Sequence, residues 1–239
     1  MPRNVGLSIS AEDGPMTIYD AEPEGDPVGA VIVLQEAFGV NEHVEDVTRR
    51  FAASGFRAVA PHLYHRTGDP VVAYDDIQQV MPHTEAVAES GLLADLDATL
   101  QYLETAGFAT NKVGIVGFCM GGSAAFYASV RYPLAAGVSF YGGGVASGRF
   151  GFPSQIELAP QLHAPWLGLF GDRDQGIPVD QVEALRAAAS RAEVASEIVR
   201  YPDAGHGFHS DGRSSYDRPS AIDAWRRTID WLNSHLSER

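Results

Sequence analysis

The sequence predicts an α/β fold, in which a mainly parallel sheet carries helices on both faces. Three observations support this class. Continuously apolar runs of strand length alternate along the chain with longer segments of helical periodicity. Strands that are buried on both faces of a parallel sheet have this unbroken apolar character. The 239 residues contain no internal repeat and no linker long enough to separate two units, so we expect one domain over residues 1–239.

Six apolar runs are predicted to be strands. In chain order they cover residues 30–34, 56–60, 113–116, 136–141, 166–170 and 196–201. Pro61 follows the second run directly and ends that strand, because proline cannot donate a hydrogen bond to a neighbouring strand. Ligands of open parallel sheets bind beyond the carboxyl ends of the strands, so we expect the chemistry of this protein at that edge.

The segments between these strands have apolar residues three or four positions apart, which predicts helices. They cover roughly residues 42–54, 84–105, 123–132, 180–189 and 221–236. The longest internal helix has its apolar face marked by Leu92, Leu96, Leu100 and Leu103. Helices that alternate with buried strands in this way cover both faces of the sheet.

Composition excludes several classes of protein. The chain has 17 basic and 31 acidic residues, a formal net charge of −14, and therefore lacks the basic surface that nucleic acids or anionic membranes require. No run approaches the 18 apolar residues of a membrane-spanning helix, and no signal peptide is visible. A single cysteine excludes an intramolecular disulfide. We expect a cytoplasmic monomer or homodimer.

That cysteine occupies a specific local pattern. The strand at residues 113–116 runs into Gly-Phe-Cys-Met-Gly-Gly at residues 117–122 and then into a helix. This is the layout of a G-x-S-x-G nucleophile elbow, with Cys119 at the nucleophile position. A lone cysteine is more often a small buried apolar residue. The strand, the flanking glycines and the helix together favour a nucleophile, because a helix N-terminus stabilises a thiolate.

A nucleophile of this type needs a histidine base held by a carboxylate. Asp172 and Asp174 follow the strand at 166–170, and His206 follows the strand at 196–201, so all three lie at the sheet edge of the elbow. The order nucleophile, acid, histidine is that of α/β-hydrolases. The aspartates are two positions apart, so a turn can present either one, and Asp174 is preferred for its place in an Asp-x-x-Ile-Pro segment. His209 is interpreted as a packing or pocket-lining residue.

Four segments together resemble the dienelactone hydrolase (carboxymethylenebutenolidase) family. They are Gln-Glu-Ala-Phe-Gly-Val-Asn at residues 35–41, Ala-Pro-His-Leu-Tyr at 60–64, the elbow at 117–122 and Ala-Gly-His-Gly-Phe at 204–208. The resemblance extends over about residues 8–236. It implies a single-domain α/β-hydrolase fold with a Cys-His-Asp triad, no metal and no organic cofactor, acting on a small-molecule ester or lactone.

The resemblance also implies roles for individual residues. Phe38, Tyr141 and Arg213 are the candidate substrate contacts. The candidate catalytic groups are Cys119 as nucleophile, His206 as general base, Asp174 as its orienting carboxylate, Glu36 as a carboxylate that helps to activate the thiol, and the backbone N–H groups of Met120 and Ala37 as the oxyanion hole.

The chain departs from the family at the substrate arginines. Family members that cleave dienelactone hold its carboxylate with two arginines. One of these positions, four residues after the histidine, is Ser210 here, and residues 67–100, where the other is expected, contain no arginine. Arg213 is the nearest substitute, with Arg66 and Arg149 as further candidates. A neutral or weakly charged ester is therefore the expected substrate, rather than a carboxylated lactone.

Three other functions are compatible with parts of this pattern. A thioesterase would use the same acyl-enzyme chemistry. A catalytically altered or non-catalytic binding protein on the hydrolase fold would have a broken triad, whereas all three members are present here. Cysteine-elbow amidotransferases are disfavoured, because their histidine and acid occur in a different order and spacing.

Overall fold

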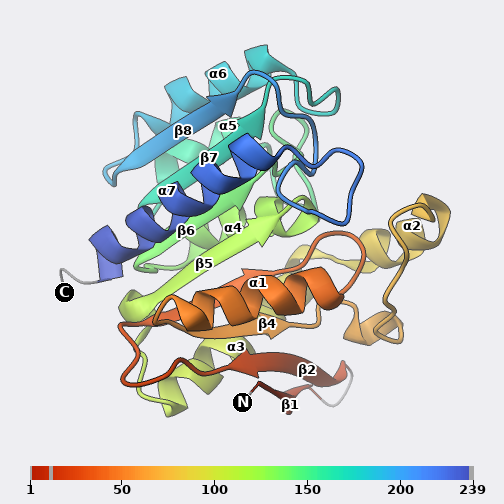
Figure 1. The fold of residues 1–239 in the computed structure, drawn as a ribbon, viewed down its shortest axis with the longest axis vertical. Coiled ribbons are helices and arrows are strands. Elements are labelled where there is room, and N and C mark those ends of the chain that lie inside the picture. The colour runs from red at the N-terminus through yellow and green to blue at the C-terminus, as the bar shows by residue number, and fades with distance from the viewer. Residues whose placement is uncertain (1, 11–12, 237–239) are drawn as a thin grey trace.

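A twisted sheet of eight strands crosses the protein in a computed structural model that describes residues 2–10 and 13–236 (Figure 1). The strand order in the sheet is β1-β2-β4-β3-β5-β6-β7-β8. The strands are β1 (Arg3–Ser10), β2 (Gly14–Ala21), β3 (Ala30–Leu34), β4 (Arg57–Pro61), β5 (Val113–Phe118), β6 (Ala136–Phe140), β7 (Trp166–Gly171) and β8 (Ser196–Tyr201).

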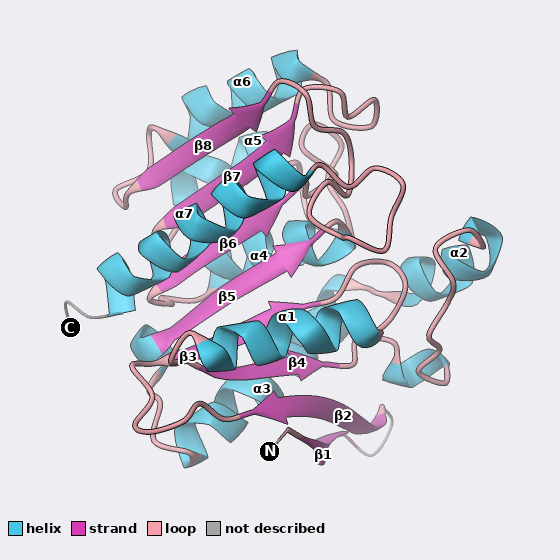
Figure 2. Ribbon diagram, in the orientation of Figure 1, coloured by secondary structure: helices cyan, strands magenta, loops and turns pink. Residues whose placement is uncertain are grey.

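The sheet is parallel from β4 to β8, and the β1–β2 hairpin adds two antiparallel strands beside β4. The helices are α1 (Glu42–Ala53), α2 (Ile77–Ala86), α3 (Glu89–Thr105), α4 (Met120–Arg131), α5 (Gln155–Leu158), α6 (Val179–Ala189) and α7 (Arg218–Leu236), with short 3₁₀ turns at His65–Thr67, Thr110–Lys112 and Ala159–Gln161. In Figures 1 and 2, α1 and α7 cover the near face of the sheet, whereas α3 and α4 lie behind it. The predicted α/β class with a mainly parallel sheet is confirmed.

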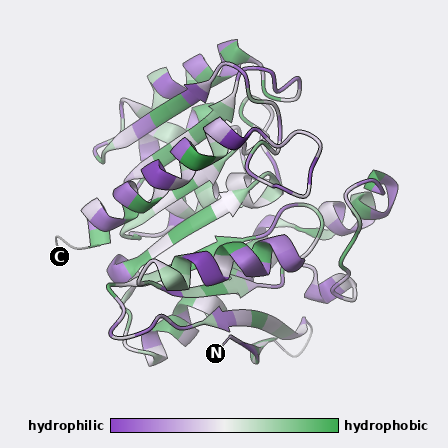
Figure 3. Ribbon diagram, viewed as in Figure 1, coloured by the Kyte–Doolittle hydropathy of each residue, from purple (hydrophilic) through white to green (hydrophobic). Residues whose placement is uncertain are grey.

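Apolar side chains of the central strands pack on both faces of the sheet. In β3, Val31 and Val33 join the core beneath α1, whereas Ile32 and Leu34 join the core on the opposite face. All five residues of β3 are buried. Figure 3 shows the same contrast, with hydrophobic central strands and hydrophilic stretches on α1 and α7. Burial on both faces explains why this strand has no polar alternation in the sequence.

Several elements differ from the sequence prediction. The predicted helix at 84–105 is two helices, α2 and α3, because Val87 and Ala88 are extended and the N–H of Glu89 donates to the carbonyl of Phe150 at 2.7 Å. Helix α4 begins at Met120, three residues earlier than predicted. The β1–β2 hairpin, α5 and the first seven residues of α2, Ile77–His83, were absent from the prediction. No helix in the described part of the chain has both the length and the apolar character needed to cross a membrane.

Candidate active site

The predicted site residues lie together at the carboxyl edge of the parallel strands. Glu36 follows β3, Cys119 follows β5, Tyr141 follows β6, Asp174 follows β7 and His206 follows β8. Because neighbouring parallel strands end on the same side of the sheet, five segments that are distant in the sequence converge there.

Cys119 occupies the sharp turn between β5 and α4. Its backbone has φ 53° and ψ −110°, and its N–H donates to the carbonyl of Phe140 at 3.0 Å. A positive φ in a non-glycine residue costs on the order of 1–3 kcal/mol, which the surrounding sheet and helix must offset. Glycine is required on either side: a Cβ on Gly117 would overlap the backbone of Gly121, and one on Gly121 would overlap the carbonyl of Leu34.

A chain of hydrogen bonds connects the cysteine, the histidine and one aspartate. The Sγ of Cys119 lies 3.1 Å from Nε2 of His206, and Nδ1 of His206 lies 2.6 Å from Oδ2 of Asp174. The carboxylate of Asp174 is buried and also accepts the N–H of Gly176 at 2.9 Å. Asp172, the alternative left open by the sequence, instead forms two 2.7 Å hydrogen bonds with Arg200. Asp174, and not Asp172, is therefore the carboxylate that contacts the imidazole.

The surroundings of His206 favour its protonated form. Burial lowers the pKa of this histidine, but the hydrogen bonds to Asp174 and Cys119 outweigh burial and raise the pKa to about 10. At neutral pH the ring is therefore an imidazolium, and its charge lies directly against the Cys119 sulfur. The N-terminus of α4 adds its positive end to the same region. Positive charge beside a cysteine sulfur is a feature of nucleophilic cysteine sites.

The two predicted oxyanion donors lie on two segments of the chain that are joined by a backbone hydrogen bond. Ala37 is in the loop after β3, and Met120 is the first residue of α4. Among the described residues, no hydrogen-bond acceptor is found for the N–H of Ala37 or of Met120. The N–H of Gly121 donates to the carbonyl of Gln35 at 3.0 Å, so this bond ties the two donor segments together. Paired backbone N–H groups can hold an oxyanion.

Glu36 forms a buried ion pair with Arg213. The glutamate is 1% exposed, its Oε1 accepts a hydrogen bond from Nη1 of Arg213 at 3.1 Å, and its Oε2 has no partner among the described residues. The guanidinium lies 5.6 Å from the ring centre of Phe38 and 5.7 Å from that of Tyr74. Arg213 therefore contacts two of the predicted site residues, Glu36 and Phe38.

The other two candidate arginines have different partners. Arg66 binds the buried carboxylate of Asp95 at 2.8 and 2.9 Å, and Arg149 lies over the ring of Phe150. The hydroxyl of Ser210, which stands at one of the arginine positions of the family, is 3.1 Å from the hydroxyl of Tyr74.

Tyr141 and His209 contribute differently to this region. Tyr141 has φ 40°, is fully buried, and has no described partner for its hydroxyl. Burial raises the pKa of Tyr141, and the charges of Glu36 and Cys119 raise it further, so this hydroxyl stays protonated next to the site. His209 packs against Phe118, and burial lowers its pKa, so it remains neutral. The interpretation of His209 as a packing residue agrees with this geometry.

Sequence reasoning gave no role to three residues that contact the site. Gln35 and Tyr64 were part of the segments that carry the family resemblance, and Tyr74 lies outside them. Their signal in the sequence is weak, because a glutamine or tyrosine near a motif is common. Only the folded chain shows that Tyr64 donates to the carbonyl of Ala37 and that Tyr74 lies beside Arg213.

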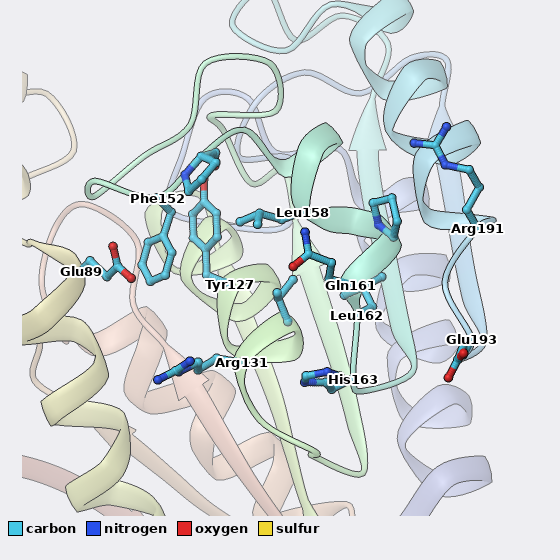
Figure 4. A pocket seen from close by; sticks show the side chains of 13 residues that line it. Glu89, Tyr127, Arg131, Phe152, Leu158, Gln161, Leu162, His163, Arg191 and Glu193 are labelled. Carbon is cyan, nitrogen blue, oxygen red and sulfur yellow. The ribbon is translucent and has the colours of Figure 1, made fainter.

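No group of three or more His, Cys, Asp or Glu side chains among residues 2–10 and 13–236 is arranged to hold a metal ion. A separate cavity of about 610 Å³ lies away from the triad, and the side chains that line it include Tyr127, Arg131, Phe152, His163 and Arg191 (Figure 4). Its lining residues come mainly from α4, from the segment between β6 and β7 and from the loop after α6. It contains none of the predicted site residues.

Comparison with known proteins gives a consistent assignment. The model of the dienelactone hydrolase family matches residues 16–236. A protein of Escherichia coli strain K12 named "Putative carboxymethylenebutenolidase" is 40% identical over 233 residues, which cover 95% of this chain and 86% of that protein. A protein of the same name from Methylorubrum extorquens is 40% identical over 234 residues, which cover 96% and 80% of the two chains.

Solved structures agree with this result. The crystal structure described as a putative dienelactone hydrolase from Klebsiella pneumoniae superposes with a TM-score of 0.87 at 38% identity, covering 97% of this chain and 98% of that one. A dienelactone hydrolase-like promiscuous phosphotriesterase, P91, from metagenomic libraries has a TM-score of 0.79 at 22% identity and covers 98% of each chain, which supports the fold. The identification of a hydrolase from the sequence is thus confirmed, and the chain belongs to the dienelactone hydrolase family.

Proposed function

We propose that this protein hydrolyses small esters or lactones through an acyl intermediate on Cys119. The observation that supports the proposal most directly is the alignment of Cys119, His206 and Asp174, with 3.1 Å and 2.6 Å between successive groups. A thiolate, a proton donor and a buried carboxylate in this order are the parts required for acyl transfer.

Acylation begins with attack of the Cys119 thiolate on the carbonyl carbon. A C–S bond forms, and the carbonyl electron pair moves to oxygen, where the N–H groups of Ala37 and Met120 stabilise it. The oxyanion then collapses, the C–O bond to the leaving group breaks, and the His206 imidazolium protonates the departing alkoxide. Asp174 keeps Nε2 of the ring directed at the sulfur and at the leaving group. The product is an acyl-thioester and an alcohol, or a single ring-opened chain if the substrate is a lactone.

Deacylation repeats these steps with water. Neutral His206 removes a proton from water, and the resulting hydroxide attacks the thioester carbonyl. The second oxyanion occupies the same two N–H donors, then collapses with cleavage of the C–S bond. The carboxylic acid leaves, and the thiolate–imidazolium pair is restored. No oxidant, metal or organic cofactor takes part in this sequence.

Glu36 and Arg213 define the remaining polar side of the site. In this proposal Glu36 supports activation of the thiol, and Arg213, Phe38 and Tyr141 contact the substrate. The charge of Arg213 is already paired with Glu36 at 3.1 Å, so this side of the site has no net charge to attract an anionic substrate. We therefore propose neutral or weakly charged esters as substrates. A markedly higher kcat/KM for carboxylated lactones than for their methyl esters would overturn this substrate class.

Replacement of Cys119 by alanine tests the mechanism. We expect C119A to lose turnover of a p-nitrophenyl acyl ester, while the wild type forms an acyl-enzyme of increased mass under rapid quench. Full activity of the variant would disprove nucleophilic catalysis by this residue. Alkylation by iodoacetamide separates an enzyme from a binding protein: a resting binding protein would alkylate slowly, with no pH feature below 8.

The working form in this proposal is a single domain in the cytoplasm. A monomer or a homodimer is expected. Sedimentation at several protein concentrations distinguishes the two states, and equal specific activity over the same range would support an active monomer.

A further inference from the structure

We propose that Gln35 and Tyr64 are positioning residues that hold the two oxyanion N–H groups in place. The inference rests on the function proposed above and concerns two side chains to which that function gives no role. Gln35 is fully buried and Tyr64 is 1% exposed, so water does not compete for their polar groups. Each side chain donates one hydrogen bond to a backbone carbonyl next to the N–H of Ala37.

Gln35 acts on the peptide that carries the first donor. Its Nε2 donates to the carbonyl of Glu36 at 3.4 Å, and its Oε1 accepts the N–H of Leu63 at 3.1 Å. The carbonyl of Glu36 and the N–H of Ala37 belong to one planar trans peptide, so they point in opposite directions. When the carbonyl is held on the side of Gln35, the N–H is held toward the opposite side, where it can meet a substrate.

Tyr64 acts on the next peptide along the chain. Its hydroxyl donates to the carbonyl of Ala37 at 2.9 Å. The peptides before and after Ala37 are joined only by the φ and ψ of that residue. With Gln35 holding one peptide and Tyr64 holding the other, neither angle can change freely, and the N–H of Ala37 keeps its direction.

The same two residues connect the first donor to the second. The backbone carbonyl of Gln35 accepts the N–H of Gly121 at 3.0 Å, and the hydroxyl of Tyr64 lies 3.4 Å from Sδ of Met120. Gly121 and Met120 form the first turn of α4, which carries the second donor. The spacing between the two N–H groups therefore depends on contacts that converge on Gln35 and Tyr64.

This role predicts an effect on turnover that a purely structural role does not. Thiolate attack on an alkyl halide develops no oxyanion, whereas ester cleavage develops one at each step. If Tyr64 positions the donors, its loss should slow ester cleavage and leave alkylation of Cys119 unchanged. General loss of structure would slow both reactions together.

The experiment uses Tyr64→Phe, which keeps the ring and removes only the hydroxyl. Loss of a whole oxyanion donor typically lowers kcat by about 10²–10³-fold. Because Y64F loosens a donor without removing it, we expect kcat for a p-nitrophenyl ester to fall by about 10-fold. KM and the rate of iodoacetamide alkylation should stay within twofold of the wild-type values, and the shape of the pH–rate profile should be unchanged.

Tyr127→Phe is the matched control. Tyr127 is also 1% exposed, and its hydroxyl donates to a backbone carbonyl, that of Pro153, at 3.2 Å. It lines the separate cavity of Figure 4 rather than the site. The two variants lose the same kind of bond, so Y127F should be comparably destabilised and keep its kcat. Gln35→Met, similar in length but without hydrogen-bonding groups, should lower kcat at least as far as Y64F.

The outcomes separate this inference from the proposed function. Hydrolysis that depends on Cys119 in the wild type, together with a kcat of Y64F within twofold of wild type, would overturn the positioning role alone. Equal losses of kcat and of alkylation rate in Y64F would also overturn it. If C119A hydrolyses the ester as fast as the wild type, the proposed function fails instead.

Discussion

Replacement of Arg213 by methionine is expected to destabilise the protein strongly for a single substitution near its surface. The variant keeps most of the apolar length of the side chain and removes the charge that faces Glu36 at 3.1 Å. Glu36 is 1% exposed and its second oxygen already has no described partner, so the carboxylate would remain buried without any.

The expected magnitude follows from the exposure of the two partners. Breaking a buried ion pair from one side costs about 3–5 kcal/mol, because the other charge is left uncompensated. The Arg213 side chain is 21% exposed, so we take the lower end, about 3 kcal/mol. In a chain of this size, such a loss lowers the melting temperature by about 6–12 °C.

Urea unfolding followed by circular dichroism measures this loss, provided that the m-value is unchanged. The variant R213M/E36Q removes both charges and should recover stability to within about 1 kcal/mol of the wild type. Arg173→Met is the control, since Arg173 and its partner Asp203 are 66% and 78% exposed, and it should cost less than about 1 kcal/mol. The reasoning would be refuted if R213M lowered the free energy of unfolding by less than about 1 kcal/mol. It would also be refuted if the losses of R213M and E36Q simply added in the double variant.

Three further predictions concern the triad and the elbow. Asp174→Asn should lower kcat by about 10⁴-fold through loss of ring orientation, whereas Asp172→Asn should stay near wild type, and similar rates for both would contradict the assignment. The kcat/KM of the wild type should fall above about pH 10, as His206 loses the proton destined for the leaving group. In D174N this alkaline decline should begin at a lower pH, because the aspartate no longer raises the pKa of the ring. An alkaline decline at the same pH in D174N and in the wild type would exclude this cause. Gly121→Ala should yield little folded protein, since its Cβ would overlap two backbone oxygens, while Gly6→Ala, with open space around it, should be tolerated in a thermal melt.

The fold was largely predictable because most of its strands are buried on both faces. The boundaries of β3 and β8 agree with the predicted ranges, and each apolar run was matched by a strand within two residues. The break between α2 and α3 was not predictable, because helical periodicity continues through it. It depends on the bond from Glu89 to Phe150, a contact between distant segments. Strand β1 is largely exposed, and β2, although mostly buried, has no continuous apolar run.

The site residues likewise include some that local sequence patterns predict and others that depend on long-range contacts. Cys119 and His206 lie in short motifs in which the local backbone requires glycine, so the sequence alone indicates these two residues. The sequence does not show which carboxylate the turn after β7 presents to His206, and in the folded chain Asp174 is the one that lies 2.6 Å from the ring. The pairing of Glu36 with Arg213 joins residues 177 positions apart, and no local pattern encodes it.

The order in which the strands are synthesised has a consequence for how the thiol becomes reactive. Cys119 precedes its histidine by 87 residues, and the histidine follows β8, the last strand of the sheet. In the proposed mechanism, Cys119 can therefore gain its histidine partner only after β8 pairs with β7. Because the chain contains one cysteine, any change in the rate of thiol alkylation during refolding is a change at Cys119. The thiol of Cys119 can thus be used to follow folding without an added label.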